Sequence, residues 1–165
     1  MSSGIAYAEG RPHAHPSIIS NNVDQHSNSP TVLRFVLLHH QVSPSYRNQS
    51  GRNDHFDLMI QSDDANVLIT WSLGIDPFDA VDALATSSPQ PHVLNTPATR
   101  IADHRIDYLT YEGPVSNDRG WVRRVREGEA QWLAVKDDHF EAEFKTGEAT
   151  YQVVIDRGVA VFSRS

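Results

Sequence analysis

The chain has 165 residues, 39% of them hydrophobic, and its 14 basic and 21 acidic residues give a formal net charge of −7. This length and composition suit one ordinary domain with one core, and the negative charge argues against strong non-specific DNA binding, which depends on Lys and Arg side chains that neutralise phosphates. No cysteine is present, which excludes disulfides, thiolate catalysis and cysteine-ligated zinc and leaves only N and O ligands for a metal.

Residues 1–30 are rich in Ser, Asn, His and Pro and show no sustained hydrophobic periodicity, which predicts a disordered arm that ends at Pro30. We interpret the scattered histidines of this arm (His13, His15 and His26) as inert, because ordering the arm around a metal would cost backbone entropy. No apolar run approaches the length of a membrane span, and the N-terminus lacks the basic and apolar regions of a signal peptide. We therefore expect a cytoplasmic protein.

Residues 31–165 are predicted to form one domain that is mostly β. Runs of apolar and alternating residues predict short strands at 32–40, 55–61, 67–73, 105–111, 119–126, 130–135, 139–145, 150–156 and 159–163. Turn residues such as Gly113-Pro114, Gly128, Gly147 and Gly158 separate these runs. The pattern favours a single closed or partly open barrel of short antiparallel strands.

One short helix is predicted at 77–85, because Asp76 can cap it and Pro77 suits its first turn. The segment that follows, residues 87–97, contains three prolines and is predicted to be a loop. The three tryptophans, Trp71, Trp121 and Trp132, all lie within strand patterns, so we interpret them as core or rim residues in preference to base-stacking platforms.

The run His55-Phe56-Asp57-Leu58-Met59-Ile60 alternates polar and apolar side chains at the period of a β-strand. The aromatic and aliphatic members can enter the core, while His55 and Asp57 share the other face. An imidazole and a carboxylate placed in this way form part of a divalent-metal site, although polar residues on a half-buried strand are also often just solvated. The pair His39-His40 ends the preceding strand and offers a third ligand, and the spacing leaves open which of the two it is.

A second polar group follows in the run Asp103-His104-Arg105-Ile106-Asp107-Tyr108, which places a His and a Tyr four residues apart, just before Tyr111-Glu112-Gly113-Pro114. Together with Arg34-Phe35-Val36-Leu37-Leu38-His39-His40 and the His-aromatic-Asp-Leu motif at residues 55–58, this group resembles the 3′-phosphoesterase domain found at the N-terminus of bacterial DNA ligase D and as a stand-alone protein. The resemblance covers about residues 32–125.

The resemblance implies that His40, His55 and Asp57 hold a divalent metal, Mn²⁺, and that His104 and Tyr108 lie at the phosphate as catalytic residues. The implied reaction is metal-dependent hydrolysis at a DNA 3′ end, which removes a 3′-phosphate or a 3′-ribonucleotide during DNA repair, with a DNA ligase and a polymerase as partners. By ligand type alone the same site would suit Zn²⁺, Fe²⁺ or Co²⁺, and a small phosphoester would also fit it.

The chain departs from the family pattern at Met59, where the family has an Arg that holds the scissile phosphate, and at Ala102, which replaces a Glu; the segment between His40 and His55 is also longer. Met cannot donate to an oxyanion as Arg does. Six arginines and four acidic residues lie between residues 100 and 126, and among them Arg105 and Arg119 are our candidates for the missing phosphate contact. Arginines on strand faces are also often just solvated. The alternative function is a non-catalytic module on the same barrel that binds a nucleic-acid end or a repair partner.

Overall fold

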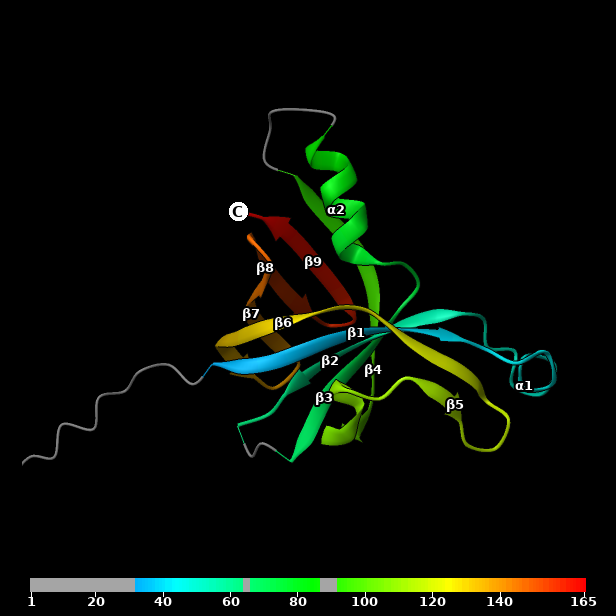
Figure 1. Cartoon of the computed structure of the whole chain (residues 1–165). Coiled ribbons are helices and arrows are strands. Elements are labelled where there is room, and N and C mark those ends of the chain that lie inside the picture. The colour runs from blue at the N-terminus through cyan, green and yellow to red at the C-terminus, as the bar shows by residue number, and fades with distance from the viewer. Residues whose placement is uncertain (1–31, 64–65, 87–91) are drawn as a thin grey trace, which may run out of the picture.

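The computed structural model describes residues 32–63, 66–86 and 92–165 (Figure 1). The predicted disordered arm at residues 1–30 and the first part of the predicted loop, residues 87–91, lie outside this part of the chain.

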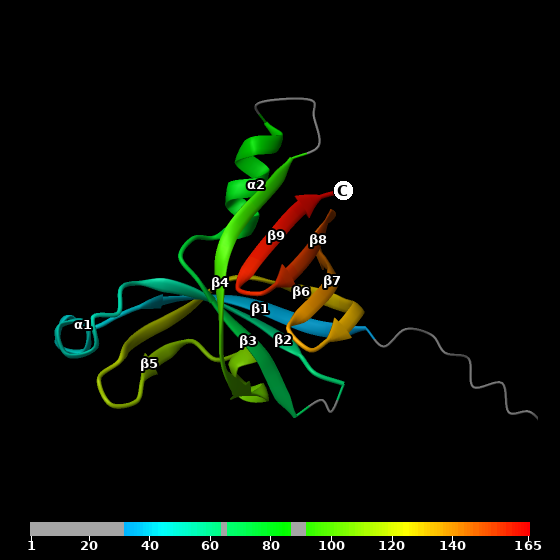
Figure 2. The ribbon, with the colours of Figure 1, turned by 180° about the vertical axis from the view of Figure 1, so that it is seen from behind.

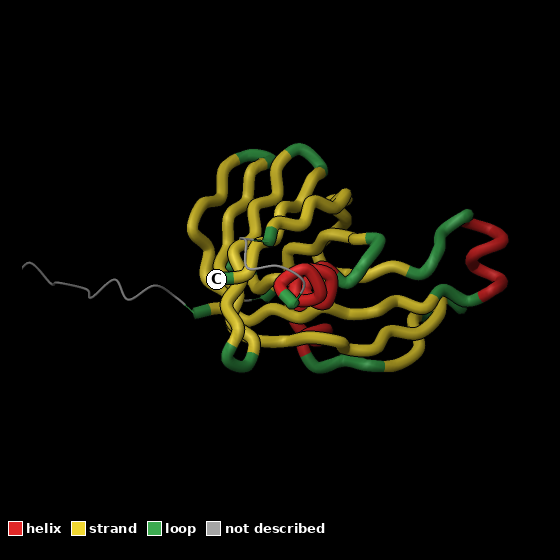
Figure 3. Tube along the Cα trace, turned by 90° about the horizontal axis from the view of Figure 1, so that it is seen from above, coloured by secondary structure: helices red, strands yellow, loops and turns green. Residues whose placement is uncertain are grey.

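The described residues form nine strands. These are β1 (Leu33–Gln41), β2 (His55–Gln61), β3 (Val67–Leu73), β4 (Val93–Arg105), β5 (Gly113–Val115), β6 (Gly120–Lys136), β7 (His139–Thr146), β8 (Ala149–Asp156) and β9 (Val159–Arg164). Their order is β1-β2-β3-β4-β9-β8-β7-β6-β5, and β1 also pairs with β6. That pairing closes eight antiparallel strands into a barrel, and the short β5 adds to β6 outside the closed ring (Figures 1 and 3). The prediction of a mostly β, barrel-like domain is confirmed.

Two short α-helices accompany the barrel, α1 (Pro44–Ser50) and α2 (Pro77–Ala85). The predicted helix is confirmed as α2, whose N-cap Asp76 accepts hydrogen bonds from two backbone N–H groups. Its Phe78 is fully buried and packs against the aromatic rings of the barrel interior. The prediction of a single helix is wrong, because α1 was missed. That helix has a capping Ser43 and a left-handed Gly51 but no buried residue, so it lacks the apolar periodicity by which helices are recognised.

Three strand boundaries also differ from the predictions. β4 begins at Val93 and spans 13 residues, so the loop predicted to reach Pro97 is wrong for the described residues after 92. Its first half pairs with β9 and its second half with β3, and it runs from the end near α2 down to the 3₁₀ helix η1 (Ile106–Leu109) (Figure 2). The strand predicted at 105–111 is therefore wrong, because the chain turns into η1 after Arg105.

The strands predicted at 119–126 and 130–135 are one strand, β6, of 17 residues. Gly128 suggested a turn between them, but it lies within the strand where the barrel closes. A Cβ at Gly128 would come within 2.0 Å of the Lys145 carbonyl oxygen and 2.9 Å of the Phe35 ring. The glycine is therefore needed for close approach of neighbouring strands.

The barrel wall has apolar side chains on both faces in one region. Residues such as Phe35, Leu58 and Trp71 fill the interior, and Trp132 packs against them, whereas Trp121 is 51% exposed. A second core lies on the outer face of β1, β2 and β3 beneath η1 and β5. It consists of Val36, Leu38, Met59, Leu68, Leu109, Val115 and Val122. This outer core covers only part of the outer face. The polar residues of the candidate site lie next to it, toward the end of β1.

Among the described residues, no helix is both long enough and apolar enough to cross a lipid bilayer.

Candidate metal centre and its cavity

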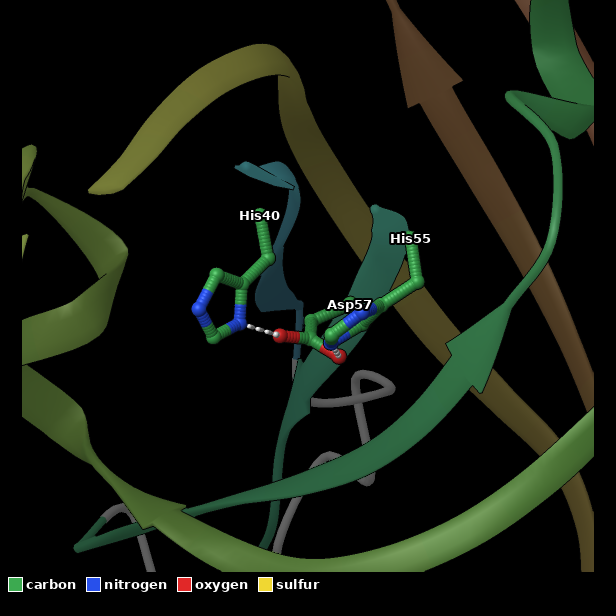
Figure 4. Close-up of side chains that lie close together, drawn as sticks. All are labelled: His40, His55 and Asp57. Carbon is green, nitrogen blue, oxygen red and sulfur yellow. Dashed lines mark ion pairs between the residues drawn. The ribbon is translucent and has the colours of Figure 1, made fainter. Parts of the chain in front are cut away.

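The three predicted metal ligands lie together on the outer face of the barrel. In the antiparallel register of β1 and β2, His40 is directly opposite His55, and Leu38 is opposite Asp57. Because side chains alternate along a strand, His40, His55 and Asp57 all project to the face opposite the barrel interior. One ligand atom from each of the three can be chosen so that all lie within 4.8 Å of one another (Figure 4).

The Asp57 carboxylate lies between the two imidazoles without a normal hydrogen bond to either. His40 Nδ1 is 3.7 Å from Asp57 Oδ2, and His55 Nε2 is 3.5 Å from Asp57 Oδ1. Both distances exceed those of ordinary N–H···O bonds. Asp57 is 3% exposed, and its Oδ1 is buried without a hydrogen-bond partner in the described part of the chain. A buried carboxylate oxygen is costly unless a hydrogen-bond donor or a cation satisfies it.

Each imidazole is oriented by a backbone carbonyl on the side away from Asp57. His55 Nδ1 lies 2.8 Å from the Asn53 carbonyl oxygen, and His40 Nε2 lies 3.1 Å from the Arg119 carbonyl oxygen. A carbonyl can only accept, so these two nitrogens carry the protons of the neutral rings. The unprotonated nitrogens, His55 Nε2 and His40 Nδ1, then direct their lone pairs toward the carboxylate. Metal-ligating histidines are commonly oriented in this way, by a hydrogen bond from the other ring nitrogen.

His39, which the spacing left as an alternative ligand, faces the other way. Its ring stacks on Phe56 at a centroid distance of 4.7 Å and an interplanar angle of 18°. Phe56 in turn packs against the barrel interior. Of the two adjacent histidines, the structure therefore brings only His40 to His55 and Asp57.

A cavity of about 300 Å³ opens beside the three ligands and is also lined by His104, Tyr108, Arg52 and Arg119. The structure thus brings His104, Tyr108 and Arg119, three of the residues predicted from sequence, to the candidate metal ligands. The fourth, Arg105, is exposed at the end of β4 and does not line this cavity.

His104 is oriented through Thr70 on the neighbouring strand. The Thr70 hydroxyl donates to the Leu68 carbonyl oxygen and lies 3.1 Å from His104 Nδ1. With its one proton used, the hydroxyl accepts from Nδ1–H, which leaves Nε2 of His104 unprotonated. Burial lowers the pKa of His104 below its ordinary value, and the nearby Asp57 carboxylate opposes that shift. The ring of Tyr108, carried by η1, contacts His104 edge-on at 5.1 Å.

The two arginines of the cavity come from segments on either side of it. Arg119 lies in the turn between β5 and β6, and its Nε and Nη2 donate to the carbonyl and hydroxyl oxygens of Ser116. Arg52 lies between α1 and β2 and was not identified from sequence. The available signal was the segment between His40 and His55, which contains Arg52 and is longer than the predicted resemblance would lead one to expect.

Met59 and Ala102, where the sequence departs from the predicted resemblance, also line the cavity. Met59 is fully buried in the outer core and gives the cavity an apolar wall together with Val115 and Val122. Ala102, two residues before His104, also lines the cavity. Neither side chain can contact an anion by charge or by hydrogen bonding.

Fold and site together define a closed antiparallel β-barrel with a His–His–Asp cluster at an outer cavity. No family model matches the chain, and no curated protein matches it either. The resemblance to the 3′-phosphoesterase domain stays a prediction.

Proposed function

We propose that this chain is a divalent-metal-dependent phosphoesterase that acts on DNA 3′ ends and removes a 3′-phosphate or a 3′-ribonucleotide. The observation that carries the proposal is the His40, His55 and Asp57 cluster beside a cavity that also holds His104 and Arg119. A phosphoester is an anion, so its hydrolysis needs positive charge next to a group that can accept a proton. This cavity offers both.

The donor set supports binding of a divalent cation such as Mn²⁺. Two neutral imidazole nitrogens and a carboxylate suit first-row divalent metals, and Zn²⁺, Fe²⁺ and Co²⁺ share the preference. The buried Asp57 oxygen without a hydrogen-bond partner and the two carbonyl-oriented histidines fit such an ion. When bound, the cation would draw charge from a non-bridging phosphate oxygen.

His104 is assigned the part of a proton acceptor for the attacking water. Its Nδ1 is committed to Thr70, and its lowered pKa keeps the imidazole neutral near pH 7. Nε2 is therefore free to accept a proton. Tyr108 holds the orientation of this ring through its edge contact. Arg119 uses two of its five N–H donors on Ser116, which leaves others for a phosphate oxygen.

In a second candidate function, the chain binds the metal but does not catalyse hydrolysis. Met59 gives one wall of the cavity an apolar surface where the resembling family has an arginine. That observation favours a module that binds a nucleic-acid end or a repair partner without cleaving it. The arginines that line the cavity favour the enzyme, because they supply the charge that Met59 does not.

The test is phosphate or ribonucleotide release from a primer-template DNA that bears a 3′-phosphate or a single 3′-ribonucleotide, with Mn²⁺, comparing the native chain with His55→Ala and His139→Ala. His139 lies at the start of β7, pairs with Glu141 and lies outside the cavity, so its variant controls for loss of a histidine. Binding of Mn²⁺ is measured in parallel by titration calorimetry.

Turnover that is lost in His55→Ala and kept in His139→Ala is the expected result. Binding of Mn²⁺ and of the DNA end without turnover would instead favour the binding module. A native chain that binds no divalent metal would overturn both functions.

A further inference from the structure

A second cavity adjoins the first across the outer face of the barrel. It has a volume of about 330 Å³ and shares Arg52, His55 and Ile101 with the cavity beside the metal ligands. In the strand register Asp57 is opposite Ser72, and Ser72 is opposite Thr99. The polar row that begins at the candidate metal ligand Asp57 thus continues across β3 and β4 into the second cavity.

Arg52 stands where the two cavities meet, and its guanidinium has no hydrogen-bond or ion-pair partner among the described residues. The nearest acidic residue in sequence, Asp54, is already engaged. Asp54 accepts from the Val42 N–H at 2.8 Å and from the Arg47 guanidinium at 2.6 Å. Arg52 is therefore a cation at the junction whose charge is unpaired within the part of the chain that the structure describes.

The segment that carries Arg52 is anchored to its surroundings. At its start, Ser43 caps α1 and donates to the Asp118 carbonyl, and Ser45 contacts the Asp118 carboxylate. At its end, the contact between Asp54 and Val42 holds the strand entry. These contacts join the segment to the β5–β6 turn, which carries Arg119. The two segments that carry Arg52 and Arg119 are therefore hydrogen-bonded to each other.

The second cavity has the chemistry of a site for a neutral, hydroxyl-bearing group. Pro97 and Ile101 supply apolar surface, and Ser72 and Thr99 supply hydroxyls. Apart from Arg52, no Lys or Arg among the described residues lines it, and the acidic Asp54 does. A second phosphate would meet no further positive charge there, whereas a sugar with an attached ring system would find apolar and hydrogen-bonding partners.

We propose that Arg52 binds the phosphoryl group of the substrate at the junction, and that the second cavity receives the nucleoside to which this phosphoryl group is esterified. The proposal deepens the function proposed above and depends on it for the identity of the substrate. It places the terminal nucleoside over β3 and β4, with its phosphate between Arg52 and Arg119.

The test uses titration calorimetry on the full chain, with and without Mn²⁺, with two probes: thymidine 3′-monophosphate and inorganic phosphate. The variants are Arg52→Gln, Arg52→Lys and Thr99→Tyr, and the matched control is Arg157→Gln. The Arg157 side chain is 84% exposed and lies outside both cavities. Tyr is well tolerated on strand surfaces, and unfolding midpoints check that each variant is folded.

Arg52→Gln is expected to lower the affinity for both probes by about 10- to 100-fold, because a charge-assisted contact to phosphate is lost. The affinity for Mn²⁺ alone is expected to stay within about twofold of the native value. Arg52→Lys restores part of the loss, and Arg157→Gln changes nothing. The native chain is expected to bind thymidine 3′-monophosphate more tightly than inorganic phosphate. Thr99→Tyr is expected to abolish this difference in affinity and to leave the affinity for inorganic phosphate unchanged.

Unchanged binding of both probes by Arg52→Gln, or a native chain that binds Mn²⁺ but neither probe, would overturn the inference while the metal site stands. An unchanged probe preference in Thr99→Tyr would overturn the nucleoside subsite. If the native chain binds no metal, the proposed function fails, and the metal-free titrations still decide whether Arg52 binds phosphate.

Discussion

The Nε2 atom of His40 lies 3.1 Å from the backbone carbonyl oxygen of Arg119. One residue of the β5–β6 turn thus orients a candidate metal ligand through its backbone and lines the adjacent cavity through its side chain. Any displacement of this turn is expected to change metal binding and phosphate binding together.

The ligand assignment predicts different effects for the two adjacent histidines. His40→Ala is expected to lower the affinity for Mn²⁺ by more than about 100-fold, since loss of an outer partner of a ligand alone typically costs about 10- to 100-fold. His39→Ala removes a ring that stacks on Phe56 on the opposite face and is expected to leave the affinity unchanged. Titration calorimetry with Mn²⁺ measures both. Equal losses in the two variants would contradict the assignment of His40.

The β5–β6 turn depends on Gly120, which has φ +118° and approaches β1 closely. A Cβ there would lie 2.0 Å from the Gln41 carbonyl oxygen, so Gly120→Ala is expected to destabilise the fold by about 3 kcal/mol and to weaken metal binding by moving Arg119.

The control for Gly120 is Gly147→Ala. Gly147 also has positive φ, +59°, but nothing lies within 4 Å of its Cβ position, so a loss of only about 1 kcal/mol is expected. Urea unfolding measures both variants. A similar loss in the two would show that backbone conformation, and not the close approach to β1, is what requires glycine at position 120.

Met59 is a packing residue of the outer core as well as a wall of the cavity. Met59→Arg is expected to lower the free energy of unfolding by about 3 kcal/mol or more, because it places a charge among Val36, Leu38 and Leu109 at a fully buried position. Met59→Leu conserves the volume and is expected to cost less than about 1.5 kcal/mol. Urea unfolding tests this, and a stable Met59→Arg variant would mean that the side chain reaches the cavity and its solvent.

The lowered pKa of His104 predicts a pH dependence of stability in the metal-free protein. Since burial disfavours the charged ring, the unfolded chain takes up this proton more readily than the folded one. The stabilisation is fully present above the ordinary pKa of 6.5 and is lost as the pH falls through the lower folded value.

The comparison is between the native chain and His104→Gln, which lacks this group. The difference in unfolding free energy between the two is expected to shrink as the pH is lowered from 7.5 to 5. Chemical unfolding at several pH values measures it, and a constant difference would mean that His104 titrates alike in both states.

The sequence alone indicated the class of fold and two members of the candidate metal site, His55 and Asp57. Period-two alternation placed β2 and β3 at the observed residues, because burial of one strand face selects apolar side chains at alternate positions. The same alternation placed His55 and Asp57 on one face. Asp76 and Pro77 located α2, because its cap and first turn are local chemistry.

Other features depended on contacts between segments that are distant in the chain. The choice of His40 over His39 depends on how β1 pairs with β2, and Gly128 serves the approach of β6 to β1 and β7 instead of a turn. The placement of Arg52 and Arg119 at the cavity, and of Arg105 outside it, follows from the α1 segment and the β5–β6 turn. Local sequence carries little information about such positions, because the tertiary packing of loops decides which of many solvent-accessible charges meet at one cavity.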